Sequence, residues 1–217
     1  GTWSGWIEVK GKRIDITPEE YKGTRDRSWG IRVGVGAGDV QPNPYAPEFQ
    51  FYWLWTPMVF DDFSAHYFVN EDAAGEAWNR NGMIFRSSGE AEQMRTSSSK
   101  LQFLSGTRHA STAEVAFTKS SGEELNFRIS PKWHFYMKGI GYSHEHFSHG
   151  SYHGELETGY DEFVVADMAP ENIHIQAMCD VVYTSDKGEE KGQCVLEQLI
   201  VGPHAPSGFT DVLDFAP

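Results

Sequence analysis

The sequence feature that most constrains the fold is the aromatic segment 49–60, which reads FQFYWLWTPMVF. In an extended strand, successive side chains point to opposite faces, so Phe51, Trp53 and Trp55 share one face and Tyr52 lies on the other. Aromatic residues favour strands. The row of rings has two interpretations that the sequence leaves open. It either packs in a core or forms a wall that binds a flat apolar ligand or a developing cation.

The rest of the chain repeats this extended pattern on a smaller scale. Segments of alternating polar and apolar residues are separated by clusters of Gly, Ser, Asn and Pro, at the spacing of a meandering antiparallel sheet. No pattern typical of a long helix is present. Further strands are predicted at 2–9, 12–16, 23–35, 64–71, 83–86, 100–104, 108–117, 125–129, 163–168, 173–185 and 193–201. The predicted fold is therefore all-β, an antiparallel barrel with few or no long helices.

Charge and composition limit the partners of such a barrel. The chain has 18 Lys and Arg against 31 Asp and Glu, a formal net charge of −13. Nucleic acids and anionic membranes both require a basic face, so we expect neither as a partner. No apolar run approaches the roughly 18 residues that a membrane-spanning helix needs, and no secretory signal pattern is present at the start. We therefore predict a soluble protein without membrane insertion.

The two cysteines bear on the compartment. Two are too few for a secreted disulfide scaffold, which favours a reducing, cytoplasmic location. Cys179 and Cys194 would lie opposite each other if 173–185 and 193–201 form a hairpin, so a bridge between them stays an open alternative.

The segment 23–32, which reads GTRDRSWGIR, is the densest group of candidate functional residues. In a strand, Asp26 would point away from Arg25 and Arg27, which would share the opposite face with Trp29. Asp26 is either one half of a weak surface ion pair or a functional carboxylate that faces a cavity without the arginines. The two readings differ in the side of the strand on which Asp26 lies.

Histidines provide a second group of candidates. His66 and Tyr67 are neighbours in the strand 64–71 and therefore lie on opposite faces; His66 is either a hydrogen-bonded interior residue or a functional one. Five of the nine histidines fall within 133–154. His144 and His146 alternate, so both imidazoles could lie on one face. The residues that could complete a metal site with them are His149 or His153 with Glu145 or Glu155.

A metal site would resemble that of the cupins, in which an HxH pair is followed after three or four residues by Glu. Here those positions hold Gly150 and Ser151, so we predict hydrogen-bonded structural histidines and no metal. Phosphate-binding loops, G-x-S-x-G elbows, HExxH and dinucleotide fingerprints are also absent from the sequence. We therefore predict no cofactor.

The order of these motifs resembles that of a known group. The G-x-x-D-x-x-W pattern within 23–32, followed by a loop and the aromatic segment, is similar to the AttH-like and carotenoid 1,2-hydratase (CrtC) group of lipocalin-like proteins. The segments 139–144, 149–150, 195–198 and 202–204 are similar to bacterial relatives of uncharacterised function. The resemblance implies calycin-type β-barrels in tandem, with 1–75 as the end of a first barrel or a domain junction and 76–217 as a second barrel. It also implies that an N-terminal barrel is either missing or supplied by a partner chain.

The resemblance further implies a reaction. In the hydratases the aspartate of the D-x-x-W motif is thought to protonate an isolated alkene, and Asp26 occupies that position. His66 or Tyr67 would position water or a substrate oxygen, and Arg and Ser stand here where the hydratases carry His-rich or Asn residues. Burial in an apolar barrel would keep such a carboxyl protonated. The residues expected to contact the substrate are Trp29, Trp53, Trp55, Tyr142, His144 and His149.

We therefore predict a hydratase-, isomerase- or cyclase-like enzyme that uses acid catalysis in a barrel cavity on a hydrophobic terpenoid, steroid or polyketide-like substrate. The first alternative is a non-catalytic carrier of a lipophilic small molecule, in which the same rings only bind. The second alternative is a carbohydrate-binding β-sandwich that stacks sugars on exposed tryptophans.

Overall fold

The computed structural model describes residues 1–27, 29, 50–140, 144–147, 152–185 and 188–217. Their main element is one antiparallel sheet of nine strands in the order β6-β5-β4-β3-β11-β10-β9-β8-β7. The strands are β3 (Phe51–Val59), β4 (Phe63–Glu71), β5 (Ala77–Arg86), β6 (Ala91–Gln93), β7 (Thr96–Phe103), β8 (Ala110–Thr118), β9 (Glu124–Tyr136), β10 (Ile175–Ser185) and β11 (Gly188–Val201). Consecutive strands pair with each other, except β6 and β7, which lie at the two ends of the order. The last strand, β11, returns to pair with β3.

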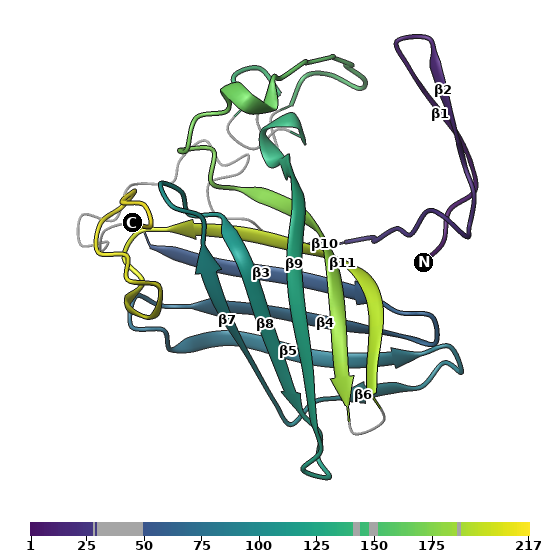
Figure 1. Ribbon diagram of the computed structural model, residues 1–217. Coiled ribbons are helices and arrows are strands. Elements are labelled where there is room, and N and C mark those ends of the chain that lie inside the picture. Colours follow the sequence, from purple (N-terminus) through teal and green to yellow (C-terminus); the bar gives the residue numbers. More distant parts are fainter. Residues whose placement is uncertain (28, 30–49, 141–143, 148–151, 186–187) are drawn as a thin grey trace.

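The sheet curls until its two halves face each other, as Figure 1 shows for β7 to β9 in front of β3 to β5. The strands β5 and β7, near the two ends of the sheet, come into contact. Across the interior, the hydroxyl groups of Tyr67 on β4 and Ser99 on β7 lie 3.1 Å apart in a hydrogen bond. The prediction of an all-β fold with an antiparallel, barrel-like sheet is confirmed.

Helical structure in the described residues is limited to three single turns. They are the 3-10 turns η1 (Met137–Ile140), η2 (Val165–Asp167) and η3 (Ala205–Ser207). The strand predicted at 163–168 is wrong, because this stretch contains η2 and its valines Val164 and Val165 are exposed rather than packed in a sheet. No helix in the described part of the chain has the length and apolar character needed to cross a membrane.

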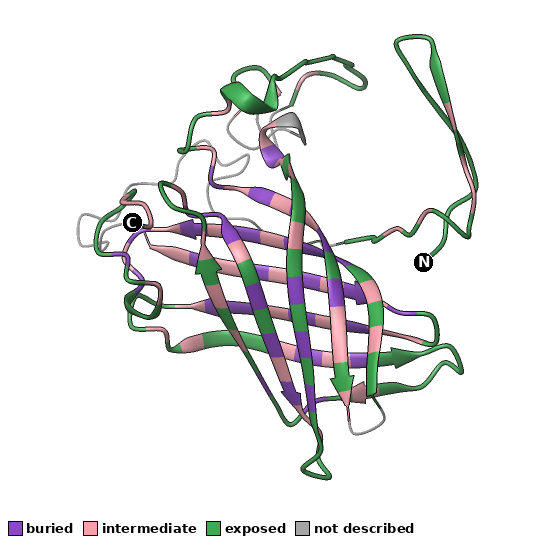
Figure 2. Ribbon diagram, viewed as in Figure 1, coloured by how far each residue is buried: buried purple, intermediate pink, exposed green. Residues whose placement is uncertain are grey.

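The interior of the curled sheet is filled by one set of alternating side chains. In β3 the residues Tyr52, Leu54, Thr56 and Met58 are buried, whereas the residues between them are only partly buried (Figure 2). The predicted alternation of this strand is therefore confirmed. The tryptophans lie on the outer face, outside the interior core that Tyr52 and Leu54 join. Phe49 lies outside the described residues.

The hairpin of β10 and β11 confirms the predicted pairing of 173–185 with 193–201. Cys179 and Cys194 are directly opposite each other in this hairpin. Both are buried and free, so no bridge joins them.

A separate hairpin precedes the sheet. The strands β1 (Gly5–Val9) and β2 (Lys12–Ile16) pair only with each other among the described residues, and their side chains are mostly exposed (Figure 2). No described strand of the main sheet pairs with this hairpin. Trp3 and Trp6 are accordingly more than half exposed.

The predicted division of the chain at residue 75 falls inside the main sheet. Strands β3 and β4 come before that point and β5 to β11 after it, yet β4 pairs with β5 and β3 with β11 along their lengths. Strands β3 and β4 therefore belong to the same sheet as β5 to β11.

The C-terminal segment is held against one end of the sheet by a buried arginine. The Arg108 side chain is fully buried, and its guanidinium donates hydrogen bonds to the backbone oxygens of Ile200, Gly202, Asp211 and Asp214 at 2.7 to 3.2 Å. It also forms a 2.6 Å ion pair with the Asp214 carboxylate. A buried charge with this many acceptors is satisfied, but removing it leaves the acceptors unpaired.

We therefore expect Arg108→Met to lower the free energy of unfolding by about 3 to 5 kcal/mol, because it leaves a set of buried acceptors without a donor. Urea denaturation followed by tryptophan fluorescence measures this. Arg128→Met is the matched control, since the Arg128 to Glu189 pair is exposed and 3.6 Å apart. It should change stability by no more than about 1 kcal/mol. Equal effects of the two substitutions would contradict the structural role of Arg108.

Candidate functional site

The candidate site lies on the outer face of β3, β4 and β11. We call it the outer aromatic face and define it by Trp53, Trp55, His66, Phe68 and Glu197. Antiparallel pairing places Phe68 opposite Trp55 and places Glu197 on the other side of Trp55. Ring centroids are 6.0 Å apart for Trp53 and Phe68, and 5.7 Å apart for Trp55 and His66, the latter edge to face. These side chains therefore form one contiguous surface of rings.

A carboxylate is fixed at the edge of these rings. One Glu197 oxygen lies 2.9 Å from Nε2 of His174, the other accepts a 2.8 Å hydrogen bond from the amide of Gln176, and Trp53 also bonds to the carboxylate. Burial alone would raise the pKa of Glu197, but these hydrogen bonds outweigh it and the pKa lies below the usual value. Glu197 is therefore an oriented negative charge beside apolar rings.

His66 differs from the other members of the face because one of its nitrogens lacks a partner. Its Nε2 atom is buried and has no hydrogen bond to any described residue. Burial lowers the pKa of His66, and the nearby Asp26 carboxylate opposes this effect. The imidazole is accordingly neutral near pH 7. A neutral imidazole can take up a proton through its free nitrogen.

The segment 23–32 does not form the predicted strand in its described part. Residues 23–27 have no regular secondary structure, and Asp26 is exposed rather than enclosed in an apolar barrel. Trp29 is 86% exposed, with the Arg27 guanidinium 5.7 Å from its ring centroid. The structure thus brings Asp26 close enough to His66 to act on its charge, while Trp29 is too exposed to belong to a packed wall of rings.

Tyr67 lies on the other side of β4. It is fully buried in the interior, where its hydroxyl group bonds to Ser99 and burial raises its pKa to about 12. His66 or Tyr67 was predicted to position water or a substrate oxygen, and strand alternation places the two side chains on opposite faces of the sheet. Tyr67 is therefore part of the core.

A cavity of about 370 Å³ adjoins the outer aromatic face. Its floor is the outer surface of β3, β10 and β11, with Pro57, Gln176 and Val195 among the lining residues, and residues 20–24 form a wall. Gln176 links the cavity to the face, since the same side chain holds Glu197. The volume lies within the range of small-molecule sites.

The predicted histidine cluster lies on the long connection from β9 to β10. His144 uses Nδ1 to accept hydrogen bonds from the backbone of His146 and Phe147, and its Nε2 lies 3.0 Å from an Asp161 oxygen. Both of its nitrogens are thus engaged within the connection, which does not fit the predicted substrate contact. Tyr142 and His149, the other two residues predicted to bind substrate here, lie outside the described residues.

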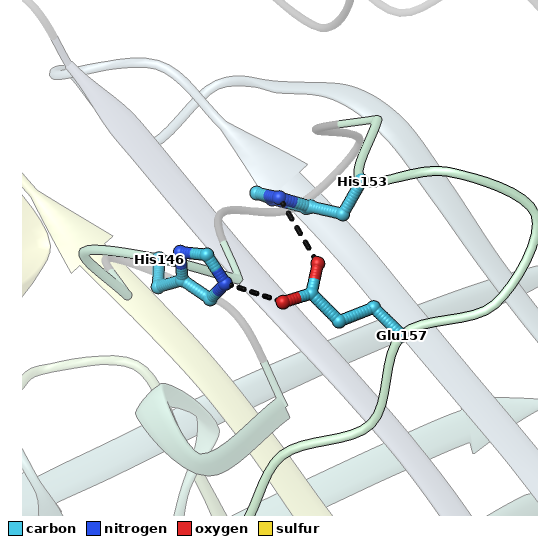
Figure 3. Close-up of side chains that lie close together, drawn as sticks. All are labelled: His146, His153 and Glu157. Atoms are coloured by element: carbon cyan, nitrogen blue, oxygen red, sulfur yellow. Dashed lines mark hydrogen bonds and ion pairs between the residues drawn. The ribbon is translucent and has the colours of Figure 1, made fainter.

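His146 and His153 share a carboxylate that the sequence analysis did not single out. It is Glu157, and not Glu145 or Glu155, that lies 2.8 Å from Nε2 of His146 and 3.4 Å from Nδ1 of His153. Figure 3 shows both imidazoles directed at the two oxygens of this one side chain.

Glu197 and His174 were also missed by sequence reasoning. A usable signal existed, because the correctly predicted hairpin of 173–185 and 193–201 places Gln176 opposite Glu197. The pairing of β11 with β3, which brings Glu197 beside Trp55, could not be predicted from local sequence patterns.

The link between Asp26 and His66 can be measured directly. Because the Asp26 carboxylate raises the pKa of His66, Asp26→Asn should lower that pKa further. Titration of the imidazole by NMR chemical shift gives the value in both proteins. Asp15→Asn, in the separate hairpin of β1 and β2, removes the same charge and should leave His66 unchanged. An unaltered pKa in Asp26→Asn would show that the two groups are not neighbours in solution.

The Glu197 network predicts a pH dependence of stability. A carboxyl whose pKa is depressed by folding stabilises the protein above its unfolded pKa of about 4.3, and this contribution is lost as the pH falls through the lower folded value. Glu197→Gln should therefore cost roughly 1 to 3 kcal/mol at pH 7. The difference from wild type should shrink in acid. Denaturant unfolding at several pH values tests this, with the exposed Glu189→Gln as the control; a difference independent of pH would contradict it.

Comparison with known proteins places the chain in a family without an established activity. The model of a family of unknown function, DUF8625, matches residues 1–210. No curated protein matches the chain. A solved structure, kievitone hydratase from Nectria haematococca, is 13% identical with a TM-score of 0.49, over 91% of this chain and 49% of that chain. The chain thus spans about half the length of that protein. Because the family model covers nearly all of the sequence, the chain belongs to the family of unknown function DUF8625.

Proposed function

We propose that the chain is a hydratase-like enzyme that adds water to a carbon–carbon double bond of a hydrophobic small molecule at the outer aromatic face. The observation that carries the proposal is the environment of His66. Its buried Nε2 lacks a partner among the described residues, the rings of Trp55 and Phe68 flank it, and Asp26 is close enough to influence its charge. A proton-transfer group among apolar rings suits chemistry on an apolar molecule.

The rings supply binding and charge stabilisation. Trp53, Trp55 and Phe68 present partly buried apolar surface that a flat or polyenic molecule would cover. Ring faces also attract positive charge, which develops on carbon when an alkene is protonated. The adjoining cavity of about 370 Å³ provides room for the remainder of the molecule.

In the proposed reaction the substrate gains one proton at carbon, and the attacking water loses one proton. The carboxyl of Asp26 gives its proton to one alkene carbon, which leaves a cation on the neighbouring carbon. Water attacks that carbon through its oxygen, and His66 takes the proton that the water loses. Transfer of this proton from His66 to the Asp26 carboxylate restores both groups. Loss of a carbon-bound proton to His66 in place of water attack would give an isomer instead.

Asp26 is exposed, so the acid role requires the substrate to cover it and exclude water. This exposure favours a second candidate function, the non-catalytic carrier, in which the outer aromatic face binds a lipophilic molecule and no proton moves. The two candidates share the binding surface and differ only in turnover.

The test uses a panel of prenylated aromatic compounds and terpenoid alkenes, incubated with the protein in oxygen-labelled water. A hydratase gives a product that carries one labelled oxygen by mass spectrometry. His66→Gln and Asp26→Asn should each lower turnover by roughly 100-fold or more while binding is retained, because general acid and base groups contribute about that much. Circular dichroism confirms that each variant is folded.

Binding is tested separately by fluorescence titration with the same compounds. Trp55→Leu should weaken binding at least several-fold, whereas Trp78→Leu, which alters an exposed tryptophan on β5, should not. Binding that depends on Trp55 without any labelled product would support the carrier. Turnover that survives both His66→Gln and Asp26→Asn would overturn the proposed roles.

A further inference from the structure

The connection between β9 and β10 is unusually long for a hairpin. It runs from residue 137 to residue 174, and its described part contains only the turns η1 and η2. Several of its apolar side chains are largely exposed, among them Leu156, Tyr160 and Val164. Connections of more than about 12 to 15 residues without regular structure are uncommon in compact domains, where they are functional segments or disordered linkers.

A cluster of polar side chains lies at the centre of this connection. The Glu157 oxygens are 2.8 Å from Nε2 of His146 and 3.4 Å from Nδ1 of His153, and one nitrogen or oxygen of each of the three residues lies within 4.8 Å of the others. The two imidazole centroids are 4.6 Å apart. The three residues converge from different stretches of the connection, as Figure 3 shows.

Neighbouring residues hold the imidazoles in place. The Phe147 ring packs edge to face against His146 at 4.7 Å and His153 at 5.8 Å. Phe147 itself rests on Gly159, where a Cβ atom would come within 2.1 Å of the ring. His144 binds the backbone N–H of both His146 and Phe147 through its Nδ1. The cluster is thus supported from two sides, as ligand sets commonly are.

We propose that His146, His153 and Glu157 form a binding site for a divalent first-row transition metal ion, with zinc as the preferred probe. Two imidazoles and a carboxylate are a ligand set that zinc accepts, with one position left for water or another group. Ligands about 2.1 Å from a tetrahedral ion lie roughly 3.4 Å from one another. The 3.4 Å separation of His153 and Glu157 matches this spacing, whereas the 2.8 Å separation of His146 and Glu157 is that of a hydrogen bond, which a bound ion would replace. The site does not depend on the proposed function.

The site cross-links the connection when it is occupied. Its ligands are separated by several residues on either side, so one ion closes two loops within a segment that buries little apolar surface. A net charge of −13 attracts cations to the whole molecule. The experiment must therefore separate a specific site from general attraction.

The experiment titrates the metal-free, tag-free full chain with Co²⁺, which reports tetrahedral coordination through its visible absorption, and then with Zn²⁺ by calorimetry. One ion per chain is expected, with Zn²⁺ displacing Co²⁺. His146→Gln, His153→Gln and Glu157→Gln should each weaken binding at least tenfold. Glu155→Gln removes the same charge two residues away and should bind like wild type.

Limited proteolysis gives an independent measurement. Zn²⁺ should slow cleavage within residues 137–174 in wild type and in Glu155→Gln, but not in His153→Gln. The proposal is overturned if no stoichiometric Co²⁺ spectrum develops. It is equally overturned if the three ligand variants bind like wild type, or if Glu155→Gln weakens binding as much as Glu157→Gln does.

Discussion

The alternation of buried and partly buried side chains along β3 is the constraint on which the rest of the structure depends. Leu54 and its alternate neighbours enter an interior that side chains from β4, β8, β9 and β10 already fill. A shift of one residue in register would exchange this set with the face that carries Trp55. Because side chains pack the interior of the sheet, we place the proposed site on its outer side. This is why His66 and Glu197 belong to the candidate site and Tyr67 does not.

The histidines of this chain differ in whether a carboxylate lies beside them. Within the described residues, five histidines lie within ion-pair distance of an Asp or Glu oxygen: His144, His146, His153, His174 and His204. Such a contact orients an imidazole and commits one of its nitrogens. His66 has no such contact, and its Nε2 lacks a partner among those residues, although rings surround it. A buried polar atom without a partner calls for an explanation, and a transferred proton provides one.

The sequence predicted most of the sheet, because alternation along a strand is a local property. The β10–β11 hairpin and the two faces of β3 follow from it. The strand predicted over residues 23–35 is absent from residues 23–27, although its alternation pattern looks similar. Alternation alone does not supply a partner, and no described strand pairs with residues 23–27. The position of Glu197 beside Trp55 was missed because it depends on the pairing of β11 with β3, two strands distant in sequence, which no local pattern specifies.

The long connection and the outer aromatic face are joined at one residue. The N–H of Met137 donates a 3.1 Å hydrogen bond to the carbonyl of His174, which closes the base of the connection. The His174 side chain in turn contacts Glu197 at 2.9 Å. The residue that ends the connection therefore also carries the imidazole that orients the carboxylate beside Trp55. The proposed metal site and the proposed chemical site share no ligand, but His174 belongs both to the connection and to the Glu197 network.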